Sequence, residues 1–315
     1  MLFGKNTLVG KLRLCYSNRK EWVLQNIRKY EKRETGMVNS LTDKITLLDG
    51  NKIPGFGFGC YNAYGEEMAN AVRMAIGAGY RYIDSATFYH NEDAVGEGLS
   101  TAGVSHDELF VLSKTWPNAY SNVEGSVMEN LKNLKVEYLD AMLLHWPWMD
   151  EALRLSAYEQ GLKLREKGLI KTMGVSNFQI DQLEKLYEEF GEWPAINELE
   201  IHPHYQQREL VEFCKSKGIQ IIAYSPIARG RYTDNADLLE IAKKYEKSTA
   251  QLILRWHTQN GIIPIPKSSH RERIIENADI FDFALSKEEM AAIDALNCNG
   301  RMGKDPYHFP TAEQM

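Results

Sequence analysis

The stretch EEMANAVRMAIGAGYRYID, residues 66–84, joins an amphipathic helical pattern to a short apolar strand pattern. Its apolar residues recur at three- or four-residue intervals as far as Ile76, and the glycines that follow are typical of the end of a helix. Residues 80–84 then have the composition of a strand that stops at Asp84. A helix followed at once by a buried strand is the repeating unit of sheets whose strands run parallel.

The same unit repeats from about residue 45 to about residue 295. The eight runs with strand composition are FGFGC (56–60), YRYID (80–84), LFVLSK (109–114), DAMLLH (140–145), KTMGVS (171–176), AINELE (195–200), IQIIAYS (219–225) and IIPIPK (262–267). Such a series predicts an α/β fold of the (β/α)8 TIM-barrel type. Ahead of it, ITLLDGNKIPGFG (45–57) predicts an N-terminal β-hairpin, because Asp49-Gly50 suits a tight turn.

An open, doubly wound sheet is the alternative architecture. Its first strand would lead into a G-x-G-x-x-G turn at the start of a helix. In GFGFGCYNAYG (55–65) the glycines lie inside the strand instead. The pattern therefore favours the barrel.

Two parts of the chain differ in charge. Residues 1–36 carry nine Lys or Arg against three Glu, whereas the whole chain of 315 residues has a net charge of −6. We interpret residues 1–36 as a basic extension, either disordered or not native, because they lack the apolar core of a secretory signal and contain too many acids for a transit peptide. Residues 37–315 form the barrel domain. The whole chain has 43% hydrophobic and 25% charged residues, as in ordinary globular proteins.

Charge, hydropathy and cysteine patterns exclude several functions. The net negative charge argues against nucleic-acid binding. No apolar run approaches the roughly 18 residues of a membrane span, so we expect a cytoplasmic protein without a membrane partner. The four cysteines are scattered, with no C-x-x-C pair and no histidine cluster, so no metal site is expected. No long heptad pattern requires a partner helix, and a monomer is expected.

Ionisable residues end three successive strands of the predicted barrel. Asp84 ends the second strand, Lys114 the third and His145 the fourth, while Tyr89 lies in the loop after the second. A TIM barrel builds its active site at these carboxyl ends. Buried charges are costly unless they are paired, so Asp84 and Lys114 are expected to form an ion pair. A cation beside Tyr89 should lower the pKa of the phenol, which could then protonate a developing alkoxide.

These residues resemble the catalytic tetrad of the aldo-keto reductases, monomeric barrel enzymes that use NADPH. The resemblance spans roughly residues 43–309 and lies in YIDSATFYHNE, VLSKTW, LLHWP, GVSNF (174–178) and AYSPI (223–227). It implies that Tyr89 is the general acid, that Lys114 tunes its pKa and that Asp84 holds Lys114 charged and oriented. His145 would help to position the carbonyl oxygen of the substrate.

The resemblance also implies a set of cofactor contacts and NADP(H) in preference to NAD(H). Ser176 and Asn177 would bind the nicotinamide carboxamide, and the nicotinamide would stack on Tyr224. Lys267, Ser268 and Arg273 would bind the 2′-phosphate, Glu276 and Asn277 would contact the adenine, and Ser225 would be a further cofactor contact. A departure from the family is Glu198, at a position where a glutamine against the nicotinamide carboxamide is usual. A glutamate can accept a hydrogen bond from the NH2 of that carboxamide but, when ionised, cannot donate one to its carbonyl.

Aromatic residues near the strand ends suggest the substrate pocket. Trp116, Trp146 and Tyr61 are its expected walls, together with Phe56 and Phe58. The function expected from the resemblance is NADPH-dependent reduction of small aldehydes or ketones, such as dicarbonyls or keto-sugar acids. Two alternatives are a nucleotide-binding regulatory barrel without significant turnover and an aldolase-like enzyme that uses Lys114 as a Schiff-base amine.

Overall fold

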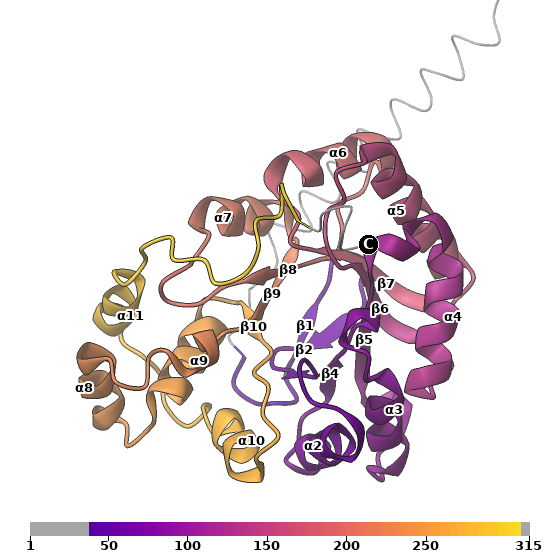
Figure 1. Cartoon of the computed structure of the whole chain (residues 1–315). Helices are drawn as coiled ribbons and strands as arrows, with labels where there is room; N and C mark the ends of the chain where they lie inside the picture. The colour runs from indigo at the N-terminus through magenta and orange to yellow at the C-terminus, as the bar shows by residue number, and fades with distance from the viewer. Residues whose placement is uncertain (1–37, 310–315) are drawn as a thin grey trace, which may run out of the picture. The chain divides into compact units, whose positions relative to one another are not determined.

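The computed structural model describes residues 38–309 (Figure 1). The predicted basic extension, residues 1–36, lies outside the described residues, as do residue 37 and residues 310–315. In the described part, a two-stranded antiparallel sheet precedes an eight-stranded sheet whose strands alternate with helices. The predicted (β/α)8 fold with an N-terminal hairpin is thereby confirmed.

All eight predicted strands are present and lie in the sheet in chain order. They are β3 (Phe58–Gly59), β4 (Tyr82–Asp84), β5 (Phe110–Thr115), β6 (Leu139–Leu144), β7 (Ile170–Ser176), β8 (Ile196–Glu200), β9 (Gln220–Tyr224) and β10 (Ile263–Pro264). Every pair of neighbours runs parallel. The strands at the two ends of this order are shorter than the sequence runs indicated. At β10 the reason is Pro264 and Pro266, which have no N–H to donate to a neighbouring strand.

Backbone hydrogen bonds close the barrel between β3 and β10. The Gly57 N–H donates to the Pro264 carbonyl at 3.1 Å, and the Gly59 N–H donates to the Pro266 carbonyl at 3.2 Å. The two backbones lie so close that a Cβ atom on Gly59 would be 2.8 Å from the carbonyl oxygen of Ile265. Glycine inside the first barrel strand is therefore required by barrel closure, because a side chain would force the backbones apart.

The hairpin closes the amino-terminal end of the barrel. Its strands β1 (Lys44–Thr46) and β2 (Lys52–Pro54) pair antiparallel, with Ile45 opposite Ile53. Ile53 and Leu47 are buried in one cluster with inward-facing side chains of the barrel strands. The Asn51 side chain donates to the carbonyl of Lys171 in β7 at 3.0 Å. The hairpin thus fills the end of the barrel opposite to the carboxyl ends of the strands.

Helices cover the outside of the sheet (Figure 1). They are α2 (Gly65–Gly77), α3 (Glu92–Thr101), α4 (Val123–Leu134), α5 (Glu151–Glu166), α6 (Ile180–Phe190), α7 (Arg208–Lys217), α8 (Ala236–Lys244), α9 (Thr249–Gln259), α10 (Arg271–Ala278) and α11 (Lys287–Asp294). Left-handed glycines end α6 and α7, namely Gly191 and Gly218 with φ of 72° each. None of the helices within residues 38–309 has the length and apolar character of a membrane span.

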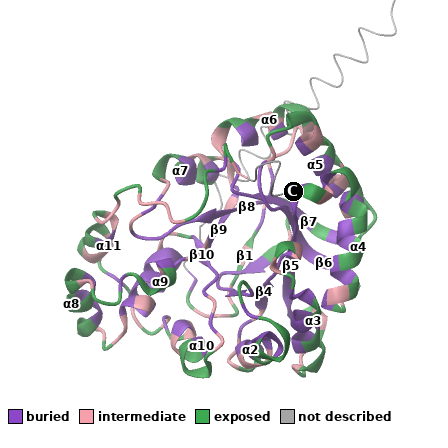
Figure 2. Cartoon of the chain, viewed as in Figure 1, coloured by how far each residue is buried: buried purple, intermediate pink, exposed green. Residues whose placement is uncertain are grey.

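Each strand packs one face into the barrel and the other against the helices. The inner core contains Tyr82, Phe110, Leu112, Leu143 and Ile222. The residues between them face outward, as Ile83 and Val111 do, and pack in the larger core under the helices. Figure 2 shows the strands almost entirely buried, with exposed residues on the outer faces of the helices. The inner core of the barrel is therefore apolar below its rim.

Candidate active site

The inward-facing side chains change from apolar to ionisable at the carboxyl ends of the strands. Asp84 follows Tyr82 by two positions on β4, and Lys114 follows Leu112 by two positions on β5. Residues two apart in a strand face the same side, so each ionisable group continues an inward-facing column. Parallel strands then bring the acid and the lysine to one rim.

Lys114 lies at the centre of the ionisable groups at this rim, which we call the polar layer, and none of its side chain is exposed. Its ammonium donates to Asp84 Oδ1 at 2.5 Å, to the Ser85 carbonyl at 3.0 Å and to Tyr89 Oη at 3.3 Å. Glu198 Oε2 lies at 3.3 Å on another side. Burial disfavours the charged form, yet the charges of Asp84 and Glu198 raise the pKa of Lys114 well above its ordinary value. The predicted ion pair is present, and Lys114 is an ammonium at neutral pH.

Asp84 is fixed by a second partner. The Tyr82 hydroxyl donates to Asp84 Oδ2 at 2.5 Å, and both side chains are buried. The carboxylate is held at both oxygens, and it therefore holds the ammonium of Lys114 in one place. Sequence reasoning missed Tyr82, although its spacing of two from Asp84 on one strand is a usable signal.

Tyr89 ends a short 3-10 helix, η1 (Thr87–Tyr89), which is separated from the end of β4 by two residues. Its ring packs edge-on against Tyr61, with centroids 5.1 Å apart, and against His145, with centroids 5.7 Å apart. Burial raises the pKa of Tyr89 above its ordinary value, and Lys114 opposes this rise without overcoming it. The expected lowering of the phenol pKa was therefore wrong. The reason is that desolvation of the half-buried phenol outweighs the effect of Lys114, which keeps the phenol protonated until a stronger base arrives.

His145 directly follows β6 and is buried. Burial and the nearby charge of Lys114 lower the pKa of His145 well below its ordinary value, so the imidazole is neutral. Its Nδ1 atom has no hydrogen-bond partner within residues 38–309. The backbone carbonyl of His145 accepts from the Asn177 side chain at 3.1 Å. A neutral imidazole held in this way can form a hydrogen bond with the oxygen of a ligand.

Ser176 and Asn177 connect the ends of β7, β8 and β9. The Ser176 hydroxyl donates to the Glu198 carbonyl at 3.0 Å, and the Tyr224 hydroxyl donates to Asn177 Oδ1 at 2.8 Å. Asn177 has a φ of 65°, in the left-handed region that asparagine tolerates better than most residues. These bonds hold the ring of Tyr224 at the rim.

Glu198 is the second acid beside Lys114, and it is 1% exposed. Its Oε2 atom accepts no hydrogen bond from the residues that the structure describes. Burial and the charge of Asp84 raise the pKa of Glu198 to about 8, although Lys114 opposes the rise. The raised pKa favours the protonated form of Glu198, whereas Asp84 is paired with Lys114.

A cavity of about 1290 Å³ opens above the polar layer. Most of the predicted site residues line it: Asp84, Tyr89 and His145 at one side, Asn177, Glu198, Tyr224 and Ser225 along the strand ends, and Lys267, Ser268, Arg273, Glu276 and Asn277 after β10. Lys114 and Ser176 are buried and are not among its lining residues. The geometry therefore brings the predicted catalytic and cofactor groups to one site.

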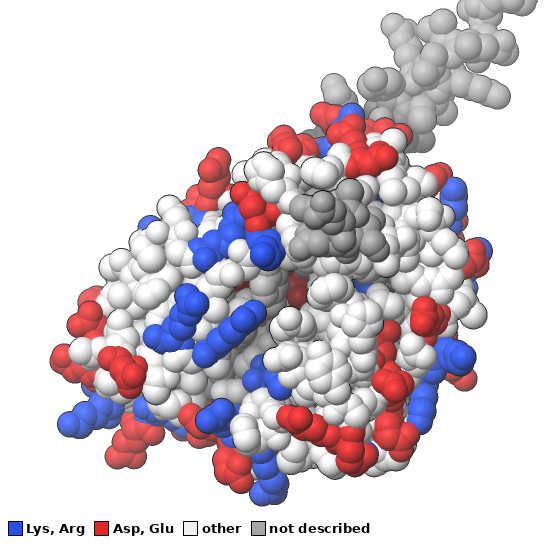
Figure 3. Space-filling view, viewed as in Figure 1, with Lys and Arg blue, Asp and Glu red and all other residues white. Residues whose placement is uncertain are grey.

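Four cations line this cavity. Lys267 and Arg273 were predicted, whereas Arg229, on η4 (Ala228–Gly230), and Lys304 were missed. Figure 3 shows Lys and Arg side chains gathered along a hollow in the molecular surface. The Lys267 ammonium also donates to the Asn62 carbonyl at 3.0 Å, which ties the segment after β10 to the loop after β3. Clustered cations are typical of sites for phosphate groups.

Aromatic side chains form another wall of the cavity. Trp116, Trp146 and Tyr61 line it as predicted. Phe88 stacks on Trp116 with centroids 3.9 Å apart. The predicted role of Phe56 and Phe58 was wrong. Both side chains are fully buried and pack against Tyr80 under the helices, because they lie ahead of the strand end.

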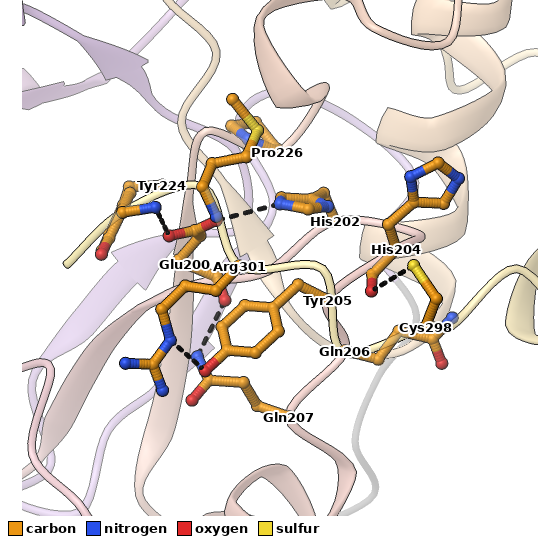
Figure 4. A network of polar contacts seen from close by, with 12 residues as sticks. Glu200, His202, His204, Tyr205, Gln206, Gln207, Tyr224, Pro226, Cys298 and Arg301 are labelled. Atoms are coloured by element: carbon orange, nitrogen blue, oxygen red, sulfur yellow. Dashed lines mark hydrogen bonds and ion pairs between the residues drawn. The ribbon is translucent and has the colours of Figure 1, made fainter. Parts of the chain in front are cut away.

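The C-terminal segment, which includes Met302, Gly303 and Phe309, reaches the cavity and is anchored by Glu200 (Figure 4). Glu200 accepts from the Met302 N–H at 2.6 Å and from the Gly303 N–H at 2.7 Å. His202 contacts the same carboxylate at 3.0 Å. Met302 and Gly303 both line the cavity, so Glu200 holds part of its wall. Sequence reasoning missed this anchor, although Glu200 follows Glu198 by two positions on β8 and so faces the same side.

The chain is similar to proteins of one family over most of its length. The model of the aldo/keto reductase family matches residues 57–298. A glyoxal reductase of Bacillus subtilis (strain 168) is 44% identical over 273 residues, which are 86% of this chain and 98% of that protein. A methylglyoxal reductase of Escherichia coli (strain K12) is 39% identical over 267 residues, 84% of this chain and 97% of that protein. The solved structure of a Bombyx mori aldo-keto reductase in complex with NADP superposes with a TM-score of 0.78 at 37% identity, covering 84% of this chain and 95% of that chain.

Proposed function

This chain belongs to the aldo/keto reductase family, and we propose that it reduces small aldehydes and ketones to alcohols with NADPH as the hydride donor and Tyr89 as the proton donor. The observation that carries the proposal is the position of Lys114. Its ammonium contacts both Asp84 and the hydroxyl of Tyr89 beneath the cavity. A phenol beside a fixed cation is suited to giving up a proton only when a strong base forms next to it.

The four residues of the tetrad have separate roles in this reaction. NADPH, when bound, supplies a hydride to the carbonyl carbon of the substrate. Negative charge then builds on the carbonyl oxygen, and Tyr89 Oη donates its proton to that oxygen. Lys114 stabilises the phenolate, and Asp84 keeps the ammonium in place. The neutral His145 forms a hydrogen bond with the carbonyl oxygen, which fixes it beside Tyr89.

The residues of the cavity fit a nicotinamide dinucleotide. Tyr224 offers an aromatic ring near the tetrad, held by its bond to Asn177, and stacking on such a ring would fix the face of the nicotinamide. Lys267 and Arg273 lie after β10 and would bind a 2′-phosphate through two charges. NAD(H) lacks that phosphate, so NADP(H) is the proposed cofactor. The Bombyx mori relative is a complex with NADP.

Small dicarbonyl compounds are the proposed substrates. The relatives named above are a glyoxal reductase and a methylglyoxal reductase. Trp116, Trp146 and Tyr61 give the substrate side of the cavity apolar walls, and His145 with Tyr89 supply polar groups for one oxygen. All these groups come from one chain, which supports a monomer as the active form.

The test is NADPH oxidation with glyoxal, methylglyoxal and a panel of aliphatic and aromatic aldehydes, run in parallel with NADH. We expect turnover with NADPH and much weaker turnover with NADH. Binding of NADPH without oxidation by any carbonyl compound would instead indicate a regulatory nucleotide-binding barrel.

Arg273→Ala tests the phosphate site with a matched control. Loss of one cation beside a phosphate should weaken NADPH binding by about tenfold or more while NADH binding stays unchanged. Arg271→Ala is the control, because Arg271 is exposed at the start of the same helix and does not line the cavity. Equal loss of NADPH and NADH affinity in Arg273→Ala would refute the assignment.

A further inference from the structure

Two acids compete for one ammonium at the floor of the cavity. Lys114 Nζ lies 2.5 Å from Asp84 Oδ1 and 3.3 Å from Glu198 Oε2, and within residues 38–309 it is the one cation that contacts either acid. Asp84 also accepts from Tyr82, whereas Glu198 Oε2 accepts no hydrogen bond from the described residues. Asp84 is therefore the better partner, and a charge on Glu198 would be poorly compensated.

A proton or a second cation can compensate that charge. Glu198 lines the cavity between Asn177 and Tyr224, at the strand ends where the proposed nicotinamide site lies. The nicotinamide ring is positively charged when oxidised and neutral when reduced. The oxidised ring can replace a proton on Glu198 as the source of positive charge, whereas the reduced ring cannot.

We propose, building on the NADP-dependent function above, that Glu198 keeps its proton when NADPH is bound and releases it to solvent when NADP+ is bound. Glu198 thereby makes the preference between the two redox forms depend on pH. By linkage, the affinity for NADP+ rises with pH over the range in which free Glu198 is protonated, while the affinity for NADPH does not. The enzyme then holds its oxidised product cofactor more tightly in alkaline solution.

The other ionisable groups that face Glu198 do not account for such a dependence near neutral pH. Lys114 has a pKa far above neutral, and burial raises the pKa values of Tyr82, Tyr89 and Tyr224 above their ordinary value. Asp84 is paired with Lys114. His145, across Lys114, has a pKa well below its ordinary value. A titrating 2′-phosphate is common to both redox forms and cancels in their ratio.

The experiment measures dissociation constants of NADP+ and NADPH by fluorescence titration of the whole protein, at constant ionic strength. If the pKa of Glu198 falls by one unit or more in the oxidised complex, the preference for NADP+ over NADPH rises about fivefold or more between about pH 6.5 and pH 8.5. Glu198→Gln keeps the shape of the side chain without the titrating group. In this variant the ratio of NADP+ affinity to NADPH affinity should not change with pH. Glu159→Gln, an exposed acid on α5, should behave like the wild type.

Calorimetry on the wild type provides a second readout that needs no variant. Titrations in two buffers of different ionisation enthalpy should show about half a proton or more released per NADP+ bound near pH 7, and close to none for NADPH. The inference would be overturned if the ratio of NADP+ affinity to NADPH affinity did not change with pH in the wild type, or if it rose equally in Glu198→Gln. Either result would leave the proposed function intact. Failure to bind either form would overturn both.

Discussion

Replacing Lys114 with methionine should destabilise the barrel strongly. Methionine fills a similar volume but removes the ammonium that contacts Asp84. The two side chains are 0% and 1% exposed, so the acid that remains is poorly solvated. Loss of one partner of a buried ion pair costs about 3–5 kcal/mol. With a urea dependence of roughly 3 kcal/mol per molar, the unfolding midpoint should fall by about 1–1.7 M.

Urea unfolding, followed by circular dichroism and tryptophan fluorescence, measures this loss. The double variant Lys114→Met/Asp84→Asn should regain about half of the lost stability or more, because neither charge is then left unpaired. Lys163→Met is the control, since Lys163 pairs with Glu159 at 2.8 Å on the surface. This substitution should lower the free energy of unfolding by less than about 1 kcal/mol. The reasoning is refuted if Lys114→Met is as stable as that control, or if the double variant is no more stable than the single one.

Three further substitutions test separate parts of the structure. Glu200→Gln removes charge-assisted bonds worth about 1.5–3 kcal/mol, so hydrogen exchange of the two backbone amides bound to Glu200 should become about tenfold faster or more, and unchanged exchange would exclude the anchor. Burial lowers the pKa of His257 to about 3. The unfolded chain therefore binds a proton that the folded protein does not, and about 2 kcal/mol of stability is lost between pH 7 and pH 5. His257→Gln should lack this loss in urea unfolding, and an equal acid sensitivity would contradict the assignment. Gly59→Ala should lower the free energy of unfolding by about 1–3 kcal/mol, because Gly59 lies at the seam where β3 meets β10. A Cβ on Gly77 meets nothing within 4 Å, so Gly77→Ala should not lower the free energy of unfolding. Equal midpoints for the two alanine variants would show that the seam tolerates a side chain.

The fold was predictable because its signals are local. Apolar runs of strand length alternate with amphipathic stretches, and all eight strands were found in the predicted order. The seam between β3 and β10 was less predictable, because it depends on contacts between residues about 200 positions apart. Gly57 and Gly59 counted against an open sheet in the sequence, and only the structure shows that they allow the barrel to close.

The candidate site was predictable where residue type and strand position agree. Asp84 ends β4, Lys114 is the last residue but one of β5 and His145 directly follows β6, and the structure brings them to one rim. The pKa of Tyr89 was not predictable, because it depends on the balance between desolvation of the phenol and the charge of Lys114. The spacing of Glu200 from Glu198 indicates which side its carboxylate faces but not its partners, because the backbone amides of Met302 and Gly303 lie about 100 positions away.

The role of Tyr89 as the proton donor is tested most directly by the rate of single-turnover oxidation of bound NADPH by methylglyoxal. The rate is measured in the wild type and in Tyr89→Phe, together with the NADPH affinity of both proteins. Phenylalanine keeps the ring that packs between Tyr61 and His145 and removes only the hydroxyl. We predict a rate lower by about 100-fold or more with unchanged NADPH affinity. A Tyr89→Phe protein that oxidises NADPH at nearly the wild-type rate would contradict the account.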